Sequence, residues 1–276
     1  PDGTQSFLEN VPADQYLLLD AQTATPPVIR PNDQQPLFAR DEQRMKGGFT
    51  HQENLFYDNK REGLIPYLLS TQGPRMASAD VNGDGRIDVF IGGASGQTGQ
   101  LLLQTASGDF RPRVIPDLLL HQASEDTGLA FLDADGDGDS DLLIGSGGNE
   151  FYGADPRLQD RLYLNNGQGD FTWSSGALPA YHGQTSCLRP ADFDGDGDLD
   201  VFVGMRSVAS SYGLSPDSYL LENRGGGQFV QNETVMPQQI GLGMVTDAQW
   251  TDTDMDGDLD LVVVGDWMPI TLLRQQ

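Results

Sequence analysis

The chain has 276 residues, 37% of them hydrophobic, and it is rich in glycine (34) and proline (16). Its 41 acidic and 16 basic residues give a formal net charge of −25, which disfavours binding to nucleic acid and electrostatic docking on anionic membranes. The single cysteine, Cys187, excludes an intrachain disulfide and any multi-cysteine zinc or iron–sulfur site, and we expect it to be buried.

The first 70 residues lack the pattern that dominates the rest of the chain. Residues 21–47 are rich in Pro, Gln and Asp, which is typical of a linker, and residues 49–69 carry scattered aromatics that predict a first strand or a covering loop. We therefore divide the chain into a tail (1–20), a linker with a lead-in segment (21–70) and a repeat region (71–276). The chain opens at Pro1 without a methionine, and we expect it to be part of a longer protein.

Four Asp-rich segments of nine residues follow, and their starts are separated by 53, 59 and 60 residues. They occupy 80–88, 133–141, 192–200 and 252–260. Each is preceded by a short semi-apolar stretch and followed by an aliphatic run ending in or near glycine, such as 201–204, which favours a strand buried on both faces. A second apolar stretch and a Gly-rich turn then predict a hairpin, as in 161–171.

One repeat is thus a strand, an acidic loop, two strands, a glycine turn and a last strand, which matches one propeller blade. The sequence predicts an all-β fold, a β-propeller of four-stranded antiparallel blades with Asp-rich calcium loops. At least four blades are present, and the fourth breaks off after Leu273. We therefore expect the ring to be incomplete in this chain.

Each acidic loop has the spacing of a cation site. Counted from its first Asp, it carries Asp or Asn at positions 1, 3, 5 and 9 and glycine at position 6, where the chain must bend sharply. We predict four Ca²⁺ sites, with side-chain ligands at positions 1, 3, 5 and 9 and a main-chain carbonyl at position 7. The predicted ligands are Asp80, Asn82, Asp84, Arg86 and Asp88; Asp133, Asp135, Asp137, Asp139 and Asp141; Asp192, Asp194, Asp196, Asp198 and Asp200; and Asp252, Asp254, Asp256, Asp258 and Asp260.

Electrostatics indicates why these loops need a cation. Carboxylates held at a separation of roughly 4 Å repel by about 4 kcal/mol per pair at an effective dielectric constant near 20. Three of the loops contain no Lys or Arg, so we expect a metal ion to supply the positive charge. All-oxygen ligands disfavour zinc and copper, and a flexible loop with five or more oxygens suits calcium better than magnesium. An EF-hand is excluded because position 12 is Ile91, Ile144, Val203 or Val263 instead of Glu.

From Arg75 to its end, the chain resembles the FG-GAP/VCBS repeat family, whose blades are similar to those of the integrin α-subunit propeller. Residues 1–19 resemble the closing strands of the ASPIC/UnbV domain found in large bacterial surface proteins, and 49–54, 64–70 and 73–74 resemble the segment that follows it. The resemblance implies export, often to the outer-membrane surface as a lipoprotein, and a role in binding or adhesion. It implies no defined reaction.

We expect a binding module and no enzyme, because His51, His121 and His182 lie in unrelated contexts without a nucleophile–base pattern. The favoured function is a calcium-stiffened extracellular or cell-surface scaffold for a surface protein, a glycan or the subunits of an outer-membrane complex. The alternative is an accessory or catalytic subunit of a surface system for polysaccharide or nutrient uptake or degradation. Ligand contacts are expected in the longest insertions, 147–157 with Phe151 and Tyr152, and 206–218 with Tyr212.

Overall fold

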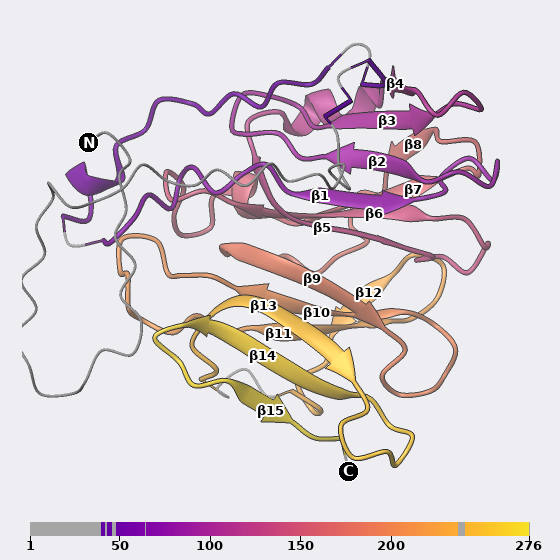
Figure 1. Cartoon of the computed structure of the whole chain (residues 1–276). Coiled ribbons are helices and arrows are strands. Elements are labelled where there is room, and N and C mark those ends of the chain that lie inside the picture. Colours follow the sequence, from indigo (N-terminus) through magenta and orange to yellow (C-terminus); the bar gives the residue numbers. More distant parts are fainter. Residues whose placement is uncertain (1–39, 42, 46–47, 64, 237–240, 276) are drawn as a thin grey trace, which may run out of the picture. The chain divides into compact units, whose positions relative to one another are not determined.

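Antiparallel sheets account for most of the regular structure of the chain (Figure 1). The computed structural model describes residues 40–41, 43–45, 48–63, 65–236 and 241–275. The predictions for the tail 1–20 and for linker residues 21–39 lie outside these ranges. Residues 42–276 form one compact unit, which is described by itself below.

The described strands make four sheets, each built from consecutive strands. The first contains β1 (Met76–Ala79), β2 (Asp88–Ile91), β3 (Gln100–Gln104) and β4 (Phe110–Arg113). The second contains β5 (Glu125–Leu132), β6 (Asp141–Gly147), β7 (Arg161–Asn165) and β8 (Phe171–Trp173). The third contains β9 (Thr185–Ala191), β10 (Asp200–Met205), β11 (Tyr219–Asn223) and β12 (Phe229–Gln231). The fourth contains β13 (Met244–Thr251), β14 (Asp260–Asp266) and β15 (Thr271–Leu273). Three 3₁₀ turns are also described, η2 (Asp58–Lys60), η3 (Pro116–His121) and η4 (Pro156–Leu158).

The all-β blade architecture predicted from the sequence is confirmed. Each acidic loop joins the first two strands of its sheet, and each hairpin joins the third and fourth strands of a complete sheet. The first strands of the later blades are longer than their apolar stretches predicted, because β5 also includes Glu125, Asp126 and Thr127, all of them buried. Asp126 pairs with buried Arg161 at 2.7 Å, and Thr127 donates to the carbonyl of Thr185 at 2.5 Å. Hydrophobic periodicity does not detect such partnered polar residues.

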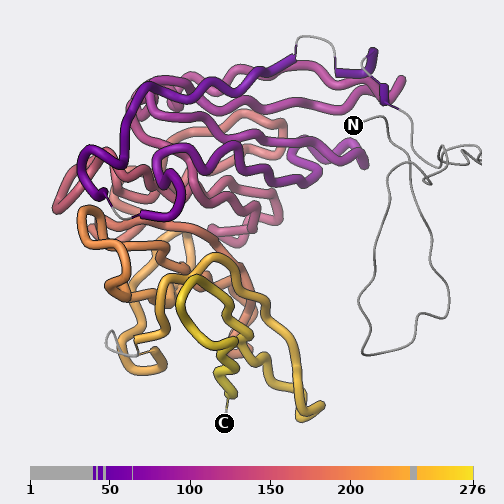
Figure 2. Tube along the Cα trace, turned by 60° about the vertical axis from the view of Figure 1, so that its left-hand side comes forward, coloured from indigo at the N-terminus to yellow at the C-terminus, as the bar shows by residue number. Residues whose placement is uncertain are grey.

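Successive sheets pack through their first strands, β1 against β5, β5 against β9 and β9 against β13 (Figures 1 and 2). A separate apolar cluster fills each interval, represented by Phe90 with Ile144, Leu143 with Val201, and Phe202 with Leu261. The first and fourth sheets lie at opposite ends of this series, so the described blades form an open arc (Figure 1).

The glycine that closes the second strand has a packing role. A methyl group at Gly204 would lie 2.5 Å from Sγ of Cys187 and 2.8 Å from a methyl carbon of Val245 in the next blade. Cys187 is buried as predicted, and burial raises the pKa of its thiol to about 11. Adjacent blades can therefore approach closely only because position 204 has no side chain.

The lead-in segment, described at residues 48–63 and 65–70, has no strand in these ranges and covers the blades as an irregular chain that includes the turn η2. It is fixed by pairs such as the amide of Gln52 with Oε1 of Gln97 and Nε2 of Gln97 with the carbonyl of Thr50, both at 2.9 Å. Of the two predicted alternatives, the covering loop is the one observed. In the described part of the chain, no helix has the length and apolar character needed to cross a membrane.

Candidate metal centres

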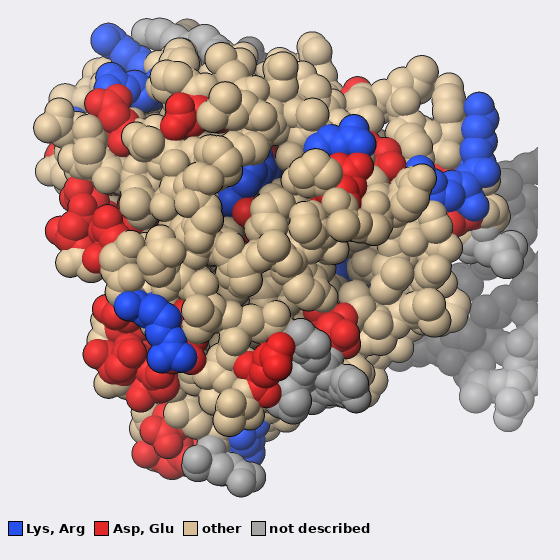
Figure 3. Space-filling view, turned by 180° about the vertical axis from the view of Figure 1, so that it is seen from behind, with Lys and Arg blue, Asp and Glu red and all other residues tan. Residues whose placement is uncertain are grey.

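All four acidic loops lie at the same edge of the blade series, because each connects the first strand of its sheet to the second. These turns lie on the right in Figure 1, and acidic side chains gather along the corresponding left-hand edge in Figure 3. The fold thus concentrates much of the negative charge on one edge of the molecule.

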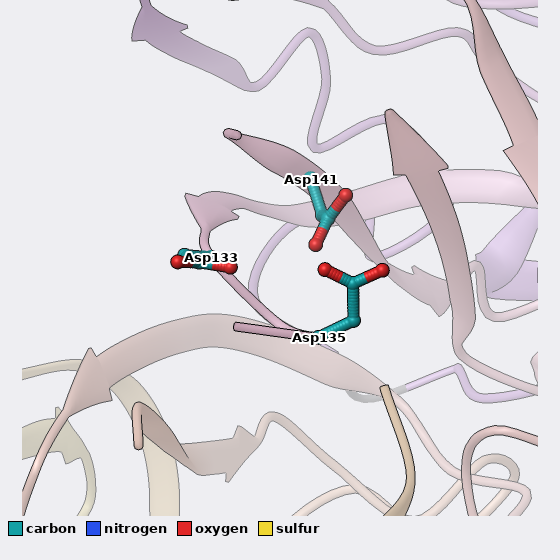
Figure 4. A group of neighbouring side chains, drawn as sticks. All are labelled: Asp133, Asp135 and Asp141. Carbon is teal, nitrogen blue, oxygen red and sulfur yellow. The ribbon is translucent and has the colours of Figure 1, made fainter. Parts of the chain in front are cut away.

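Three of the loops bring carboxylates close enough together to share one ion. In the second loop, Asp133, Asp135 and Asp141 each offer an oxygen, and these atoms lie within 4.8 Å of one another (Figure 4). The corresponding groups are Asp192, Asp194 and Asp200 in the third loop, and Asp252, Asp254 and Asp256 in the fourth. Positions 1 and 3 are common to all three groups, whereas the third member is position 9 in two loops and position 5 in the last.

The position-1 carboxylate also holds the loop in its turn. Oδ1 of Asp133 accepts the amide of Gly136 at 2.9 Å, and Oδ2 accepts that of Gly138 at 3.0 Å. Asp192 accepts the amides of Gly195 and Gly197 in the same way, at 2.8 and 3.1 Å. These bonds curl the chain around the carboxylates before any ion is added.

Glycine at position 6 is required by its backbone conformation, since φ is +99° at Gly197 and no atom lies within 4 Å of an added Cβ. We predict that Gly197→Ala lowers the free energy of unfolding by about 1–2 kcal/mol, the cost of left-handed backbone for a residue with a Cβ. It should also weaken calcium binding, measured by calorimetric titration. Gly213→Ala is the matched control, because Gly213 has φ +95° in open space outside the loops. Equal losses of calcium affinity in both variants would refute a role for Gly197 in the site.

The position-9 carboxylate is buried and has a structural role as well. Asp141 is fully buried, and its two carboxylate oxygens accept hydrogen bonds from the main-chain N–H groups of Ala134 at 2.8 Å and Asn165 at 2.7 Å. Asp141 thus ties the loop to the third strand. Burial raises the pKa of Asp141 and of Asp200 to about 6 in each case. Oδ2 of Asp200 is buried without a hydrogen-bond partner among the described residues. A cation in the third loop would satisfy that oxygen.

Arginines complicate two of the predicted sites. Arg86, predicted as a carbonyl donor, also turns its guanidinium onto Asp84, the position-5 ligand of the first loop. Arg274, which follows β15, pairs with Asp254 at position 3 of the fourth loop. The first loop is not among the three close carboxylate groups of the described residues, in part because its position 3 is Asn82. A metal must displace these arginines or share the carboxylates with them, so we expect the second and third loops to bind it most tightly.

The remaining predicted ligands lie less centrally. In the second and third loops, Asp137 and Asp196 at position 5 accept the amides of Asp139 and Asp198, each at 2.9 Å, and lie outside the close groups. The use of the position-7 carbonyl stays a prediction. The donors that do converge are carboxylate oxygens, which fit a hard cation such as Ca²⁺. Such an ion would cross-link the loop and neutralise its charge.

Two asparagines that the sequence analysis did not single out couple neighbouring loops. Asn165, at the end of β7, donates to the carbonyl of Ser140 in its own blade and to that of Val81 in the preceding blade, at 3.1 and 2.8 Å. Asn223 does the same one blade later, donating to Leu199 and Ala134. The signal was an Asn at the end of the third strand in both repeats, but its partner in the preceding blade lies more than 80 residues away.

The fold and the loops define a blade-repeat protein with candidate cation sites. A family model of the FG-GAP-like repeat matches residues 80–144 and 145–203, so the predicted resemblance to this repeat family is confirmed at two adjacent repeats. The resemblance to the ASPIC/UnbV domain stays a prediction. The chain matches no curated protein.

Solved structures that are similar to the chain include the following two. One is an Agrocybe aegerita lectin, described by its specific recognition of non-reducing terminal N-acetylglucosamine, with 18% identity, a TM-score of 0.42 and coverage of 70% of this chain and 47% of that one. The other is the V. cholerae biofilm matrix protein Bap1, with 14% identity, a TM-score of 0.31 and coverage of 69% of this chain and 28% of that one. The chain therefore spans about half the length of the first structure and under a third of the second.

Proposed function

We propose that this chain is a calcium-stabilised binding module of the cell exterior, and that it holds a glycan between two of its long loops. The proposal is one of binding and not of catalysis. Calcium loops of extracellular modules have dissociation constants of roughly 10⁻⁴ to 10⁻³ M, so they fill where calcium is abundant and stay empty in the cytoplasm. The four loops therefore favour a location outside the cytoplasm, on a surface or in a matrix.

The observation that carries the proposal is a cavity of about 350 Å³ where the insertions 147–157 and 206–218 meet. Tyr152 lines it from the first insertion, and Ser207 and Asp217 line it from the second. The side chains of Tyr181 and His182 complete a mixed aromatic and polar wall. Ligand pockets span roughly 300–1,000 Å³, so the cavity is large enough for a small ligand group.

The chemistry of this wall suits a sugar. Tyr152 is 65% exposed, and its ring can stack on the C–H face of a pyranose. The buried Oγ of Ser207 has no hydrogen-bond partner among the described residues. Phe151, the other aromatic predicted for this loop, is buried and packs beneath the guanidinium of Arg157 at 4.1 Å. It therefore supports the loop and is not available to a ligand.

A second group of aromatic rings borders the same insertion. Tyr212 lies edge-on to Tyr67 and to Trp267, with centroids 6.3 and 6.2 Å away, and Trp267 is 83% exposed. Arg206 and Asp266 pair beside them at 2.8 Å. Trp267 has φ +56°, an unusual conformation for a bulky residue that often marks a functional position. These rings could extend contacts to an oligosaccharide.

A larger cavity of about 460 Å³ has a different origin. It lies between the third and fourth sheets, and its walls are core residues such as Phe202, Leu261 and Trp250. These side chains are left uncovered beside β15, because the fourth sheet has three strands in the described part of the chain. We therefore assign this space to blade packing.

A glycan array followed by calorimetric titration tests the proposal. We expect Tyr152→Ala to weaken binding of the selected glycan by at least tenfold. Tyr57→Ala is the matched control, because Tyr57 is similarly exposed but lies outside the cavity. Each of the two rings also has a cation over it: Lys60 lies 4.6 Å from the ring of Tyr57, and Arg61 lies 5.2 Å from the ring of Tyr152. An array without hits, or equal affinity in both variants, would refute glycan binding here. Hydrolysis of the glycan by the purified chain would contradict a purely binding role.

A further inference from the structure

A second kind of acidic site lies at the far end of the second blade from its calcium loop. Glu125 is the first residue of β5 and is paired with Gly147, the last residue of β6. Glu150 follows β6 closely in the chain. Asn54, from the lead-in segment, donates Nδ2 to Oε1 of Glu150 at 2.7 Å. Three separate stretches of the chain therefore meet at this point.

The carboxylate of Glu125 is buried, and no described residue forms a hydrogen bond or ion pair with it. Glu125 is 1% exposed, and neither of its carboxylate oxygens has a hydrogen-bond partner among the described residues. Oε2 of Glu150 is likewise buried and without a partner. A buried carboxylate is normally paired, hydrogen-bonded or bound to a metal, because leaving it bare is costly. Two such carboxylates side by side increase that cost.

The two carboxylates face a common space above Gly148. A Cβ built on this glycine would lie 2.7 Å from Oε2 of Glu125 and 2.9 Å from Oε2 of Glu150. Gly148 has φ +94°, and its missing side chain leaves the space open. Both free oxygens are thus directed at one cradle that a methyl group would block.

Two amide side chains adjoin the acidic pair, since Asn54 is bonded to Glu150 and Asn149 precedes Glu150 in the chain. Nδ2 of Asn149 donates to Asp58 at 2.8 Å and to Glu62 at 2.9 Å, which fixes the amide orientation and leaves its Oδ1 buried and free. Oδ1 of Asn54 is also buried and without a partner among the described residues, since Nδ2 is held by Glu150. Carboxylate and amide oxygens are the donors that calcium prefers.

The guanidinium of Arg61 does not neutralise the carboxylates. Arg61 donates to the main-chain carbonyls of Asn149 and Glu150, the latter at 3.2 Å. These bonds hold the 149–150 turn in place but leave the charge of the Glu125 and Glu150 side chains uncompensated. Other acids nearby, Glu53 and Asp58, add to the negative potential.

We infer that Glu125 and Glu150, with the amide oxygens of Asn54 and Asn149, bind a divalent cation of the calcium class at a site separate from the four repeat loops. The ion would tie the lead-in segment to the second blade and fix the start of the insertion that carries Tyr152. The inference does not depend on what that insertion binds, because it rests on the free oxygens alone.

Equilibrium dialysis against radioactive calcium tests the site on the full chain. Glu125→Gln and Glu150→Gln are each expected to bind one calcium ion fewer per chain than the wild type, while Glu233→Gln, an exposed residue outside the cluster, should bind the same number. Asp135→Ala removes a ligand in a repeat loop, so combining it with Glu125→Gln should lose two ions if the sites are separate.

The melting temperature provides a second readout. In calcium, Glu125→Gln should have a lower melting temperature than the wild type. In excess chelator, the melting temperature of the variant should equal or exceed that of the wild type, because a neutral amide replaces an unpaired buried acid. Should Glu125→Gln not fold, Glu150→Gln decides, since that residue is only half-buried. Unchanged calcium numbers in both glutamine variants would overturn the inference and indicate that Glu125 is simply held in its protonated form.

Discussion

Removing calcium with excess chelator is expected to lower the melting temperature by roughly 20 °C or more. A site filled at 100 times its dissociation constant adds about 2.7 kcal/mol to the free energy of unfolding. Each kcal/mol changes the melting temperature by about 2–4 °C for a protein of this size. Four loops filled together would thus contribute roughly 10 kcal/mol, which is comparable to the whole stability of a typical domain. The physical source is the repulsion among carboxylates held within 4.8 Å, which an ion offsets.

The experiment is a calorimetric melt in 10 mM calcium and again in excess chelator at matched ionic strength. Magnesium at the same concentration is the control, because it prefers a strict octahedron and retains its waters, so it should restore only a small part of the lost stability. A melting temperature that does not change on chelation would show that the loops are stable as empty acidic turns.

The second large effect separates the two roles of the loop carboxylates. Asp141→Ala should lower the free energy of unfolding by about 3 kcal/mol or more in calcium and in chelator alike, because two buried amides, those of Ala134 and Asn165, lose their acceptor at about 1–3 kcal/mol each. This loss does not require a metal. Chemical denaturation in both buffers measures it.

Asp135→Ala should behave differently. Its carboxylate accepts one bond, from the amide of Asp137 at 3.2 Å, and neighbouring Asp137 and Asp133 help to raise its pKa after the larger effect of burial. We expect this variant to be destabilised in calcium, where a ligand is lost, and to equal or exceed the wild type in chelator, where repulsion is relieved. Equal destabilisation of the two variants in chelator would contradict this division of roles.

Much of the fold could be predicted from the sequence because the information was local. The strand limits of β3, β7 and β11 follow apolar stretches bounded by glycine turns, and the four Asp-rich segments repeat in register. A loop that supplies its ligands from nine consecutive residues needs no tertiary information to be recognised. The predicted blade order and the position of every loop between the first two strands are therefore correct.

The parts that were not predicted depend on distant residues. Asp141 appeared as one ligand among five, and only its full burial against Asn165 reveals its structural bond. The arginine that pairs with Asp254 comes from beyond β15, and the cluster at Glu125 joins residues 54, 125 and 150. Spacing along the chain carries no trace of such contacts, since folding alone brings these side chains together.

The most direct test of calcium binding by the repeat loops is anomalous diffraction from crystals grown in calcium. We expect one strong peak inside each loop, next to the side chains at positions 1 and 3, such as Asp133 with Asp135 and Asp192 with Asp194. Well-ordered loops that enclose only water in those crystals would contradict calcium binding by the repeat loops.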